Sequence, residues 1–194
     1  MVSFDQHLFL ILNSLHSPFF DGVMTVISFP ATWVPLYLAI IYVLIRKYGR
    51  KMIAMTVVII LLITASDQFS VLLKNSVKRP RPCYEKALEG KVHTINGRCG
   101  GAYGFVSSHA SNAFAVALLS LLLLRKKWFS VSIIIWAVIV GYSRIYLGVH
   151  YPGDVVCGSI LGALIGWAAW SVFDLTDKLY LQKSLIFNNV KKEP

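Results

Sequence analysis

Residues 52–73 have the sequence MIAMTVVIILLITASDQFSVLL, which is apolar at most positions. A helix needs about 20 mostly apolar residues to cross a hydrocarbon core of about 30 Å, so this run is long enough. Four similar runs lie at residues 32–46, 105–124, 128–147 and 153–173. Of the 194 residues, 56% are hydrophobic and only 14% are charged, unlike an ordinary soluble domain. The sequence therefore predicts an all-α integral membrane helical bundle of about five transmembrane helices.

The first thirty residues are also apolar, but polar residues interrupt the run in its middle. The interruption contains Asn13, His16, Ser17, Pro18 and Asp21. We expect two short amphipathic helices that lie at the membrane interface and meet at a turn over residues 16–18. The chain is then a single membrane domain, 1–194, with interfacial helices at 1–30, a transmembrane core at 31–173 and a cytoplasmic tail at 174–194.

The positions of lysine and arginine predict the orientation, because these residues accumulate in cytoplasmic loops near membrane ends. Eleven of the 19 join the first two runs, join the third and fourth runs, or follow the fifth: Arg46, Lys47, Arg50, Lys51, Arg125, Lys126, Lys127, Lys178, Lys183, Lys191 and Lys192. We assign these positions to the cytoplasmic side. The prediction is a multi-pass protein of the bacterial cytoplasmic membrane, whose other loops face the periplasm or the cell exterior.

The outer side carries eight basic residues, although it should be poor in them. They are Lys74, Lys78, Arg79, Arg81, Lys86, Lys91, Arg98 and Arg144. They form neither a tail nor a repeated patch, so the net charge of +10 does not indicate a nucleic-acid partner. For Lys78, Arg79, Lys86 and Lys91 we favour contacts with lipid headgroups, since long basic side chains extend toward the membrane surface.

Three of the outer cations suit a tetrahedral anion. Lys74, Arg81 and Arg144 adjoin different apolar runs, whose outer ends meet in an antiparallel bundle. They offer three positive charges and many hydrogen-bond donors to a phosphate. Ser107 or Ser108 is expected to cap the helix of the third run, where backbone N–H groups and the helix dipole favour the same anion.

Two histidines on the same side are candidate catalytic groups. His150 and Asp154 are four residues apart, and Pro152 suits the first position of the fifth helix, so the carboxylate can reach back to the imidazole. This spacing predicts His150 as a nucleophile held by Asp154. His109 follows the serines and is expected to be the general acid that protonates the leaving oxygen. The prediction includes no metal ion and no cofactor.

The cysteines divide between a loop and a helix. Cys83 and Cys99 lie in the outer loop, on the side assigned to the oxidising periplasm, while Cys157 lies in the fifth run. We favour a disulfide between Cys83 and Cys99 over two free thiols.

Several other conspicuous residues have simpler interpretations. Asp67, two helical turns before Lys74, is expected to make a buried polar contact inside the bundle. Three aromatic residues are typical of the membrane interface: Tyr146, Tyr151 and Trp128. The glycines at every fourth position of the fifth run favour close helix packing over dimerisation: Gly158, Gly162 and Gly166.

These residues resemble the motifs of the type 2 phosphatidic acid phosphatase superfamily, which also includes vanadium haloperoxidases. The first motif, a lysine, six residues and Arg-Pro, is matched by Lys74, Arg81 and Pro82. The third motif, Ser-Arg, five residues, His, three residues and Asp, is matched by Ser143, Arg144, His150 and Asp154. The second motif, Pro-Ser-Gly-His, is matched in part by Val106, Ser107, Ser108 and His109.

The resemblance covers roughly residues 74–154 and the surrounding spans. It implies a phosphohistidine intermediate on His150 and general acid catalysis by His109. It also implies phosphate binding by Lys74, Arg81, Ser107, Ser108 and Arg144. In relatives the glycine of the second motif contacts phosphate through its amide, and Ser108 offers the same amide with an added Cβ.

The expected substrate is a membrane lipid that carries a phosphate monoester or a diphosphate. Undecaprenyl diphosphate is the first choice, because an outward-facing site suits recycling of that carrier, and phosphatidylglycerophosphate, phosphatidic acid and lipid A stay open. An anion transporter and a vanadate-dependent oxidase are alternatives from other classes. The histidine-aspartate pair disfavours the first and the apolar bundle disfavours the second. The oligomeric state and the choice between hydrolysis and phosphotransfer are left open.

Overall fold

A computed structural model of the chain describes the backbone of residues 3–49 and 51–190, and their side chains except 51, 53–55, 58, 62–63, 65 and 179–190. It has seven α-helices in this part: α1 (Phe4–Asn13), α2 (Pro18–Ser28), α3 (Val34–Tyr48), α4 (Lys51–Val77), α5 (Ser108–Leu124), α6 (Lys127–Tyr146) and α7 (Pro152–Val190). Short 3-10 helices lie at Pro30–Trp33, Pro82–Tyr84 and Lys86–Leu88. The described residues contain no strand, so the predicted all-α class is confirmed.

The five predicted spans correspond to α3 to α7, but their lengths differ from the prediction. Among the residues whose side chains are described, Lys127–Tyr146 and Pro152–Lys178 are long and apolar enough to cross a membrane. The pair α1 and α2 would make a third span, bent by 115°, and α5 is apolar but only 17 residues long. α3 has 15 residues, which rise about 22 Å. The membrane helices agree with the prediction, and the number of five spans stays a prediction.

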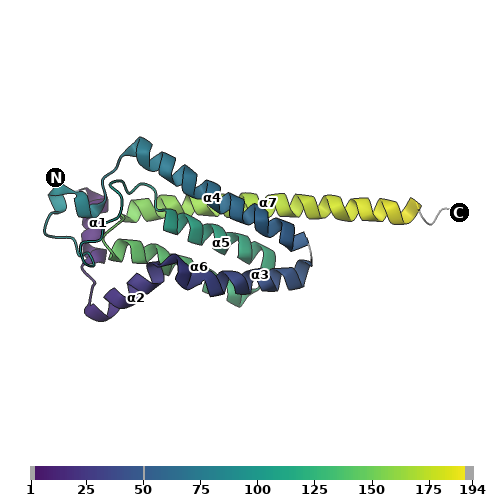
Figure 1. Ribbon diagram of the computed structural model, residues 1–194, viewed down its shortest axis with the longest axis horizontal. Helices are drawn as coiled ribbons and strands as arrows, with labels where there is room; N and C mark the ends of the chain where they lie inside the picture. The colour runs from purple at the N-terminus through teal and green to yellow at the C-terminus, as the bar shows by residue number, and fades with distance from the viewer. Residues whose placement is uncertain (1–2, 50, 191–194) are drawn as a thin grey trace.

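The predicted tail at 174–194 continues the last helix over its described part. α7 extends to Val190 and projects past the other helices (Figure 1). Lys178 and Asp174 form an ion pair of 2.6 Å one turn apart on this extension, which favours the helix. Three cations that the sequence assigned to the cytoplasmic side lie outside the described residues: Arg50, Lys191 and Lys192.

The N-terminal segment forms two helices, as predicted, and their caps explain where each begins. The backbone N–H of Gln6 donates to Ser3 Oγ, and the Gln6 side chain accepts from the Ser3 N–H, which is a capping box. Ser17 caps α2, and Pro18 is its first residue. The polar residues that interrupt the apolar run therefore produce the turn. The interfacial position of this pair stays a prediction.

Helices α3 to α7 run lengthwise, so the chain turns repeatedly between two ends of the bundle (Figure 1). The end of α4, the loop at 78–107, the beginning of α5, the end of α6 and the beginning of α7 lie at the same end as α1 and α2. The end of α3, the beginning of α4 and the connection from α5 to α6 lie at the other end. The arrangement gathers the polar outer segments at one end, as the sequence predicts.

Closest packing in the bundle is between α5 and α7. A Cβ atom on Gly162 would lie 2.0 Å from the Ser111 carbonyl oxygen, much less than a van der Waals contact. The same construction gives 2.5 Å for Gly158 against Ser107 and for Gly166 against Ala115. Only glycine allows the two backbones to approach so closely. The prediction of close packing within the bundle is confirmed.

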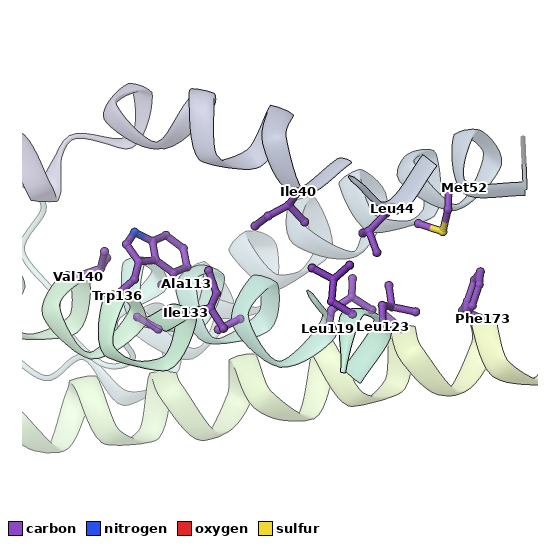
Figure 2. Close-up of a cluster of buried hydrophobic side chains, with 14 residues drawn as sticks. Ile40, Leu44, Met52, Ala113, Leu119, Leu123, Ile133, Trp136, Val140 and Phe173 are labelled. Carbon is purple, nitrogen blue, oxygen red and sulfur yellow. The ribbon is translucent and has the colours of Figure 1, made fainter. Parts of the chain in front are cut away.

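The larger of two apolar clusters lies toward the middle and the far end of the bundle, away from the polar loops. Figure 2 shows side chains of α3, α5, α6 and α7 meeting there, with Leu44, Leu119 and Trp136 among them. A polar contact crosses from α4 to α5 nearer the loops, because Asn112 Nδ2 donates to Asp67 Oδ1 at 3.0 Å. This is a polar contact within the bundle, as the sequence predicts for Asp67, but it is only partly buried.

Candidate active site

The predicted site residues belong to segments that meet at the loop end of the bundle (Figure 1). In chain order they are Lys74, Arg81, Ser107, Ser108, His109, Arg144, His150 and Asp154. Gly104 shows how closely some of them approach, because a Cβ on it would lie 3.4 Å from Arg81 Cγ and 3.6 Å from His150 Nδ1. The same point is 3.1 Å from Asp154 Oδ2. Residues far apart in the sequence therefore form a single cluster.

The N-terminus of α5 has the cap that the sequence predicts. Ser107 Oγ accepts from the Ala110 N–H at 3.4 Å, and the Ser107 N–H donates to the Asp154 carbonyl at 3.0 Å. Ser108 Oγ accepts from Lys74 Nζ at 2.7 Å. The beginning of α5 is thus fastened both to α7 and to the end of α4. The positive end of the helix dipole lies among cations, an arrangement that favours an anion.

His150 and Asp154 are both buried, with exposed fractions of 2% and 0%. His150 Nδ1 lies 3.6 Å from Asp154 Oδ2, an ion-pair separation beyond hydrogen-bond range. Because Nδ1 faces the carboxylate, Nε2 is the nitrogen left for a substrate. Burial lowers the pKa of His150 to about 4, although Asp154 acts in the opposite direction. The imidazole is therefore neutral at neutral pH, as a nucleophile must be.

His109 belongs to the same cluster of charges. It follows Ser108 in the first turn of α5 and is partly buried. Its imidazole interacts electrostatically with Arg144, His150 and Lys74. Two histidines and several cations therefore share a small volume at this end of the bundle.

Arg81 is held by the outer loop. Its Nη1 donates to the Cys99 carbonyl at 3.0 Å, and its Nε donates to the Tyr103 carbonyl at 3.2 Å. Cys99 is joined to Cys83 by a disulfide, with 6.2 Å between the Cα atoms. The disulfide closes the part of the loop that holds the guanidinium, so it supports the position of Arg81.

A cavity of about 490 Å³ opens beside Arg81 and Arg144. Arg144 Nη1 donates to Ser28 Oγ of α2, while its Nε is buried without a hydrogen-bond partner among the described residues. Other walls of the cavity come from Thr25 and Val26 of α2, from Phe29 just after it, and from Ile95, Leu147 and Val149. The cavity is much larger than one phosphate group and mostly apolar, which suits the part of a lipid headgroup next to the phosphate.

The profile of the PAP2 superfamily matches residues 51–177. The chain belongs to the PAP2 superfamily. It is 42% identical over 166 residues to a lipid A 4′-phosphatase of Bacteroides thetaiotaomicron, covering 84% of this chain and 74% of that protein. It is 31% identical over 172 residues to an undecaprenyl-diphosphatase of Sulfolobus acidocaldarius, covering 86% and 77%. The predicted membership of the type 2 phosphatidic acid phosphatase family is confirmed.

A solved PAP2 structure has a similar fold. The crystal structure of a transmembrane PAP2-type phosphatidylglycerolphosphate phosphatase from Bacillus subtilis matches with a TM-score of 0.67 and 26% identity. The match covers 89% of this chain and 85% of that one. These relatives confirm the predicted enzyme class, a hydrolase that acts on phosphoric ester or diphosphate bonds of membrane lipids.

Arg79 corrects one sequence-based interpretation within the PAP2 region. It was expected at the lipid headgroups, but its Nη1 donates to Asp154 Oδ1 at 2.7 Å and its Nη2 donates to Asp5 Oδ2 at 2.6 Å. Its guanidinium also lies 4.1 Å from the ring centre of Tyr151. Two carboxylates and an aromatic face hold it inside the protein. The other three cations given that interpretation are exposed: Lys78, Lys86 and Lys91.

Two of the three aromatic residues predicted at the membrane interface are instead buried inside the protein. Tyr146 and Tyr151 are each 1% exposed, whereas Trp128 is 72% exposed. The hydroxyl of Tyr146 donates to Asp21 Oδ1 at 2.7 Å, which holds the ring between α6 and α2. Partners from elsewhere in the chain therefore decide the burial of both tyrosines.

Asp5 is the residue near the site that sequence reasoning missed. It lies in α1, outside the residues that match the PAP2 profile, and its Oδ1 accepts from the Gly153 N–H at 2.9 Å. The two residues are 148 positions apart, and a lone aspartate in an apolar helix carries no sequence pattern that points to a partner. Its position in the first turn of α1 signals only helix-dipole compensation.

Proposed function

We propose that this PAP2 protein removes a phosphate group from a membrane lipid through a phosphohistidine on His150. The observation that carries the proposal is the buried, neutral imidazole of His150, which lies next to Asp154 with its Nε2 free and with arginines around it. Neutral imidazole is a nucleophile toward phosphorus, and surrounding cations stabilise the charge of a phosphoryl group in transfer.

Binding begins at the cations and the α5 N-terminus. Lys74, Arg81 and Arg144 balance the charge of the phosphate, and Arg144 can exchange its Ser28 contact for a phosphate oxygen. The backbone N–H groups at Ser108 and His109 add donors from the first turn of the helix. The phosphorus is then held close to His150.

In the first chemical step, Nε2 of His150 forms a bond to phosphorus while the bond between phosphorus and the lipid oxygen breaks. Protonated His109 gives its proton to that oxygen, so the lipid leaves as an alcohol or as a shorter phosphate. The bound phosphate favours the protonated form of His109 because its negative charge offsets the nearby cations. Asp154 balances the positive charge that develops on the imidazole.

In the second step, water attacks the phosphorus and His109 accepts its proton. The bond between nitrogen and phosphorus breaks, and inorganic phosphate and neutral His150 are restored. All proton transfers in this cycle use side chains of the protein.

A lipid A-type substrate, a phosphate monoester on an acylated sugar, is our first candidate. The higher identity to the lipid A 4′-phosphatase supports it, and the cavity beside the arginines has room for a sugar-sized group. Undecaprenyl diphosphate, preferred from the sequence alone, becomes the second candidate, and phosphatidylglycerophosphate is the third. We place the reaction on the outer face of the bacterial cytoplasmic membrane, opposite the basic loops.

The test offers these three lipids to purified protein in detergent with excess EDTA and measures released phosphate. We expect release from at least one lipid and none from His150→Ala. With p-nitrophenyl phosphate, His109→Gln should accumulate an acid-labile, alkali-stable phosphoenzyme, because hydrolysis loses its base while an activated leaving group needs no acid. His7→Ala, a change at an exposed residue of α1, is the control. Phosphate release by His150→Ala at the normal rate would overturn the proposal.

A further inference from the structure

The carboxylate of Asp154 contacts both the imidazole of His150 and the guanidinium of Arg79. Its Oδ2 lies against His150, while its Oδ1 accepts from Arg79 Nη1 at 2.7 Å. Asp154 is completely buried, so bulk solvent does not screen its charge. An arginine this close partly neutralises the negative charge of Asp154. The same negative charge stabilises the imidazole when it becomes cationic. Arg79 orients Asp154 and at the same time weakens its electrostatic effect on His150.

Asp5 supplies a second carboxylate to Arg79 from the opposite side. The two groups are 2.6 Å apart, and each is about a quarter exposed. Burial acts to lower the pKa of Arg79, but its contacts with Asp5 and Asp154 outweigh burial and raise it. The arginine is therefore a permanent cation shared between two anions.

The contact between Asp5 and α7 is close as well as charged. Asp5 Oδ1 accepts from the Gly153 N–H, one of the N-terminal amides of α7 that has no partner within the helix. A Cβ on Gly153 would lie 2.8 Å from Asp5 Oδ2, so a larger residue would displace the carboxylate. α1 is therefore attached directly beside Asp154.

We propose that Asp5 and Arg79 are positioning residues that set the orientation and the effective charge of Asp154 during phosphoryl transfer. Charges alternate along the chain of contacts from Asp5 to Arg79 to Asp154, and the phosphorylated imidazole of His150 continues the alternation. Asp5 balances Arg79, so that Asp154 keeps a full negative charge for the imidazole. The inference rests on the proposed role of His150 as nucleophile.

The principal test is Asp5→Asn, which keeps the shape of the side chain and an oxygen for the Gly153 N–H. Uncompensated Arg79 should then offset Asp154, and we expect kcat to fall about tenfold with KM changed less than about twofold, as for other partners of catalytic ligands. Removing the cation as well, in Asp5→Asn with Arg79→Gln, should restore part of kcat, because Asp154 again has no competing charge. A purely structural role predicts that the double variant is no better than the single one.

Gly153→Ala is the second variant, for the case that Asp5→Asn does not fold. It removes no charge but displaces the Asp5 carboxylate, so kcat should fall and KM should change little. His7→Gln, at an exposed position of the same helix, is the matched control and should behave as the unmodified protein.

Two results would overturn the inference. One is a folded Asp5→Asn or Gly153→Ala protein with unchanged kcat, and the other is a double variant with kcat at or below that of Asp5→Asn. His150→Ala is measured in parallel. If it is inactive while Asp5→Asn is fully active, only the positioning role fails, whereas an active His150→Ala removes the proposed nucleophile itself.

Discussion

α5 and α7 pack closely against each other, whereas α3 packs loosely against its neighbours. Between α5 and α7, a single added Cβ at Gly162 would enter the backbone of the opposite helix. Between α3 and α6, an apolar groove of about 740 Å³ stays open beside Trp33, Trp136 and Phe129. Another cavity of about 290 Å³ lies among α3, α4 and α5.

The two closely packed helices both carry proposed site residues. α5 and α7 carry Ser108, His109 and Asp154, and the loop before α7 carries His150. Groups that must stay within fractions of an ångström need a rigid interface, and backbone contact at glycine provides one. α3 carries none of the proposed site residues, so hydrocarbon can fill its grooves without consequence for the reaction.

The largest effect should come from filling the interface of α5 and α7. We expect Gly162→Leu to prevent assembly of the native bundle, and Gly162→Ala to destabilise it by about 3 kcal/mol, because the nearest atom is a backbone oxygen that cannot move aside. Thermal unfolding in detergent measures both. Gly22→Ala, where nothing lies within 4 Å of the added Cβ, is the control. Normal stability of Gly162→Leu would show that the two helices are farther apart than described.

Lys74 connects α4 to the closely packed region of α5 and α7, because it donates to Ser108 at the beginning of α5. We expect Lys74→Met to lower kcat/KM about a hundredfold while the unfolding temperature changes little, since a preorganised donor to the phosphate is lost. Phosphate release measures the effect. Lys86→Met removes an exposed cation of the outer loop and should have no effect. Equal losses in the two variants would mean that general surface charge, and not this position, matters.

Rigid burial should also appear in the titration of His150. Burial lowers its pKa to about 4, so the folded protein keeps a neutral imidazole as the pH falls and protonates it only near pH 4. NMR of protein labelled with ¹⁵N-histidine, assigned with His150→Gln, measures this directly. The reference value is about 6.5, the pKa of histidine in a model peptide. Titration of His150 near 6.5 would show that the site is open to water.

The smallest effect should come from the groove between α3 and α6. Ala39→Leu adds a side chain to an open apolar surface, so stability should change by less than about 0.5 kcal/mol and activity should be unchanged. Thermal unfolding and phosphate release in detergent check both. A marked loss of stability would show that this side of the bundle is as closely packed as the α5 and α7 interface.

Local signals in the amino-acid sequence by themselves determined much of this protein. Apolar runs are long enough to define helices, and Ser107 and Pro152 have properties suited to helix starts. The spacing of His150 and Asp154, with the helix starting between them, lets the carboxylate reach back to the imidazole. Each of these depends only on residues within a few positions of one another. The order and spacing of the three motifs also indicated the family, because the residues in them belong to a shared site.

Only the tertiary structure decided which cation serves which partner. Arg79 and Arg81 are two residues apart in an irregular segment, yet one holds Asp154 while the other binds loop carbonyls beside the cavity. Asp5 reaches the site because α1 packs beside the first turn of α7. Side-chain direction in a loop and contacts across the whole chain have no periodicity to reveal them, since both depend on how complete helices pack together.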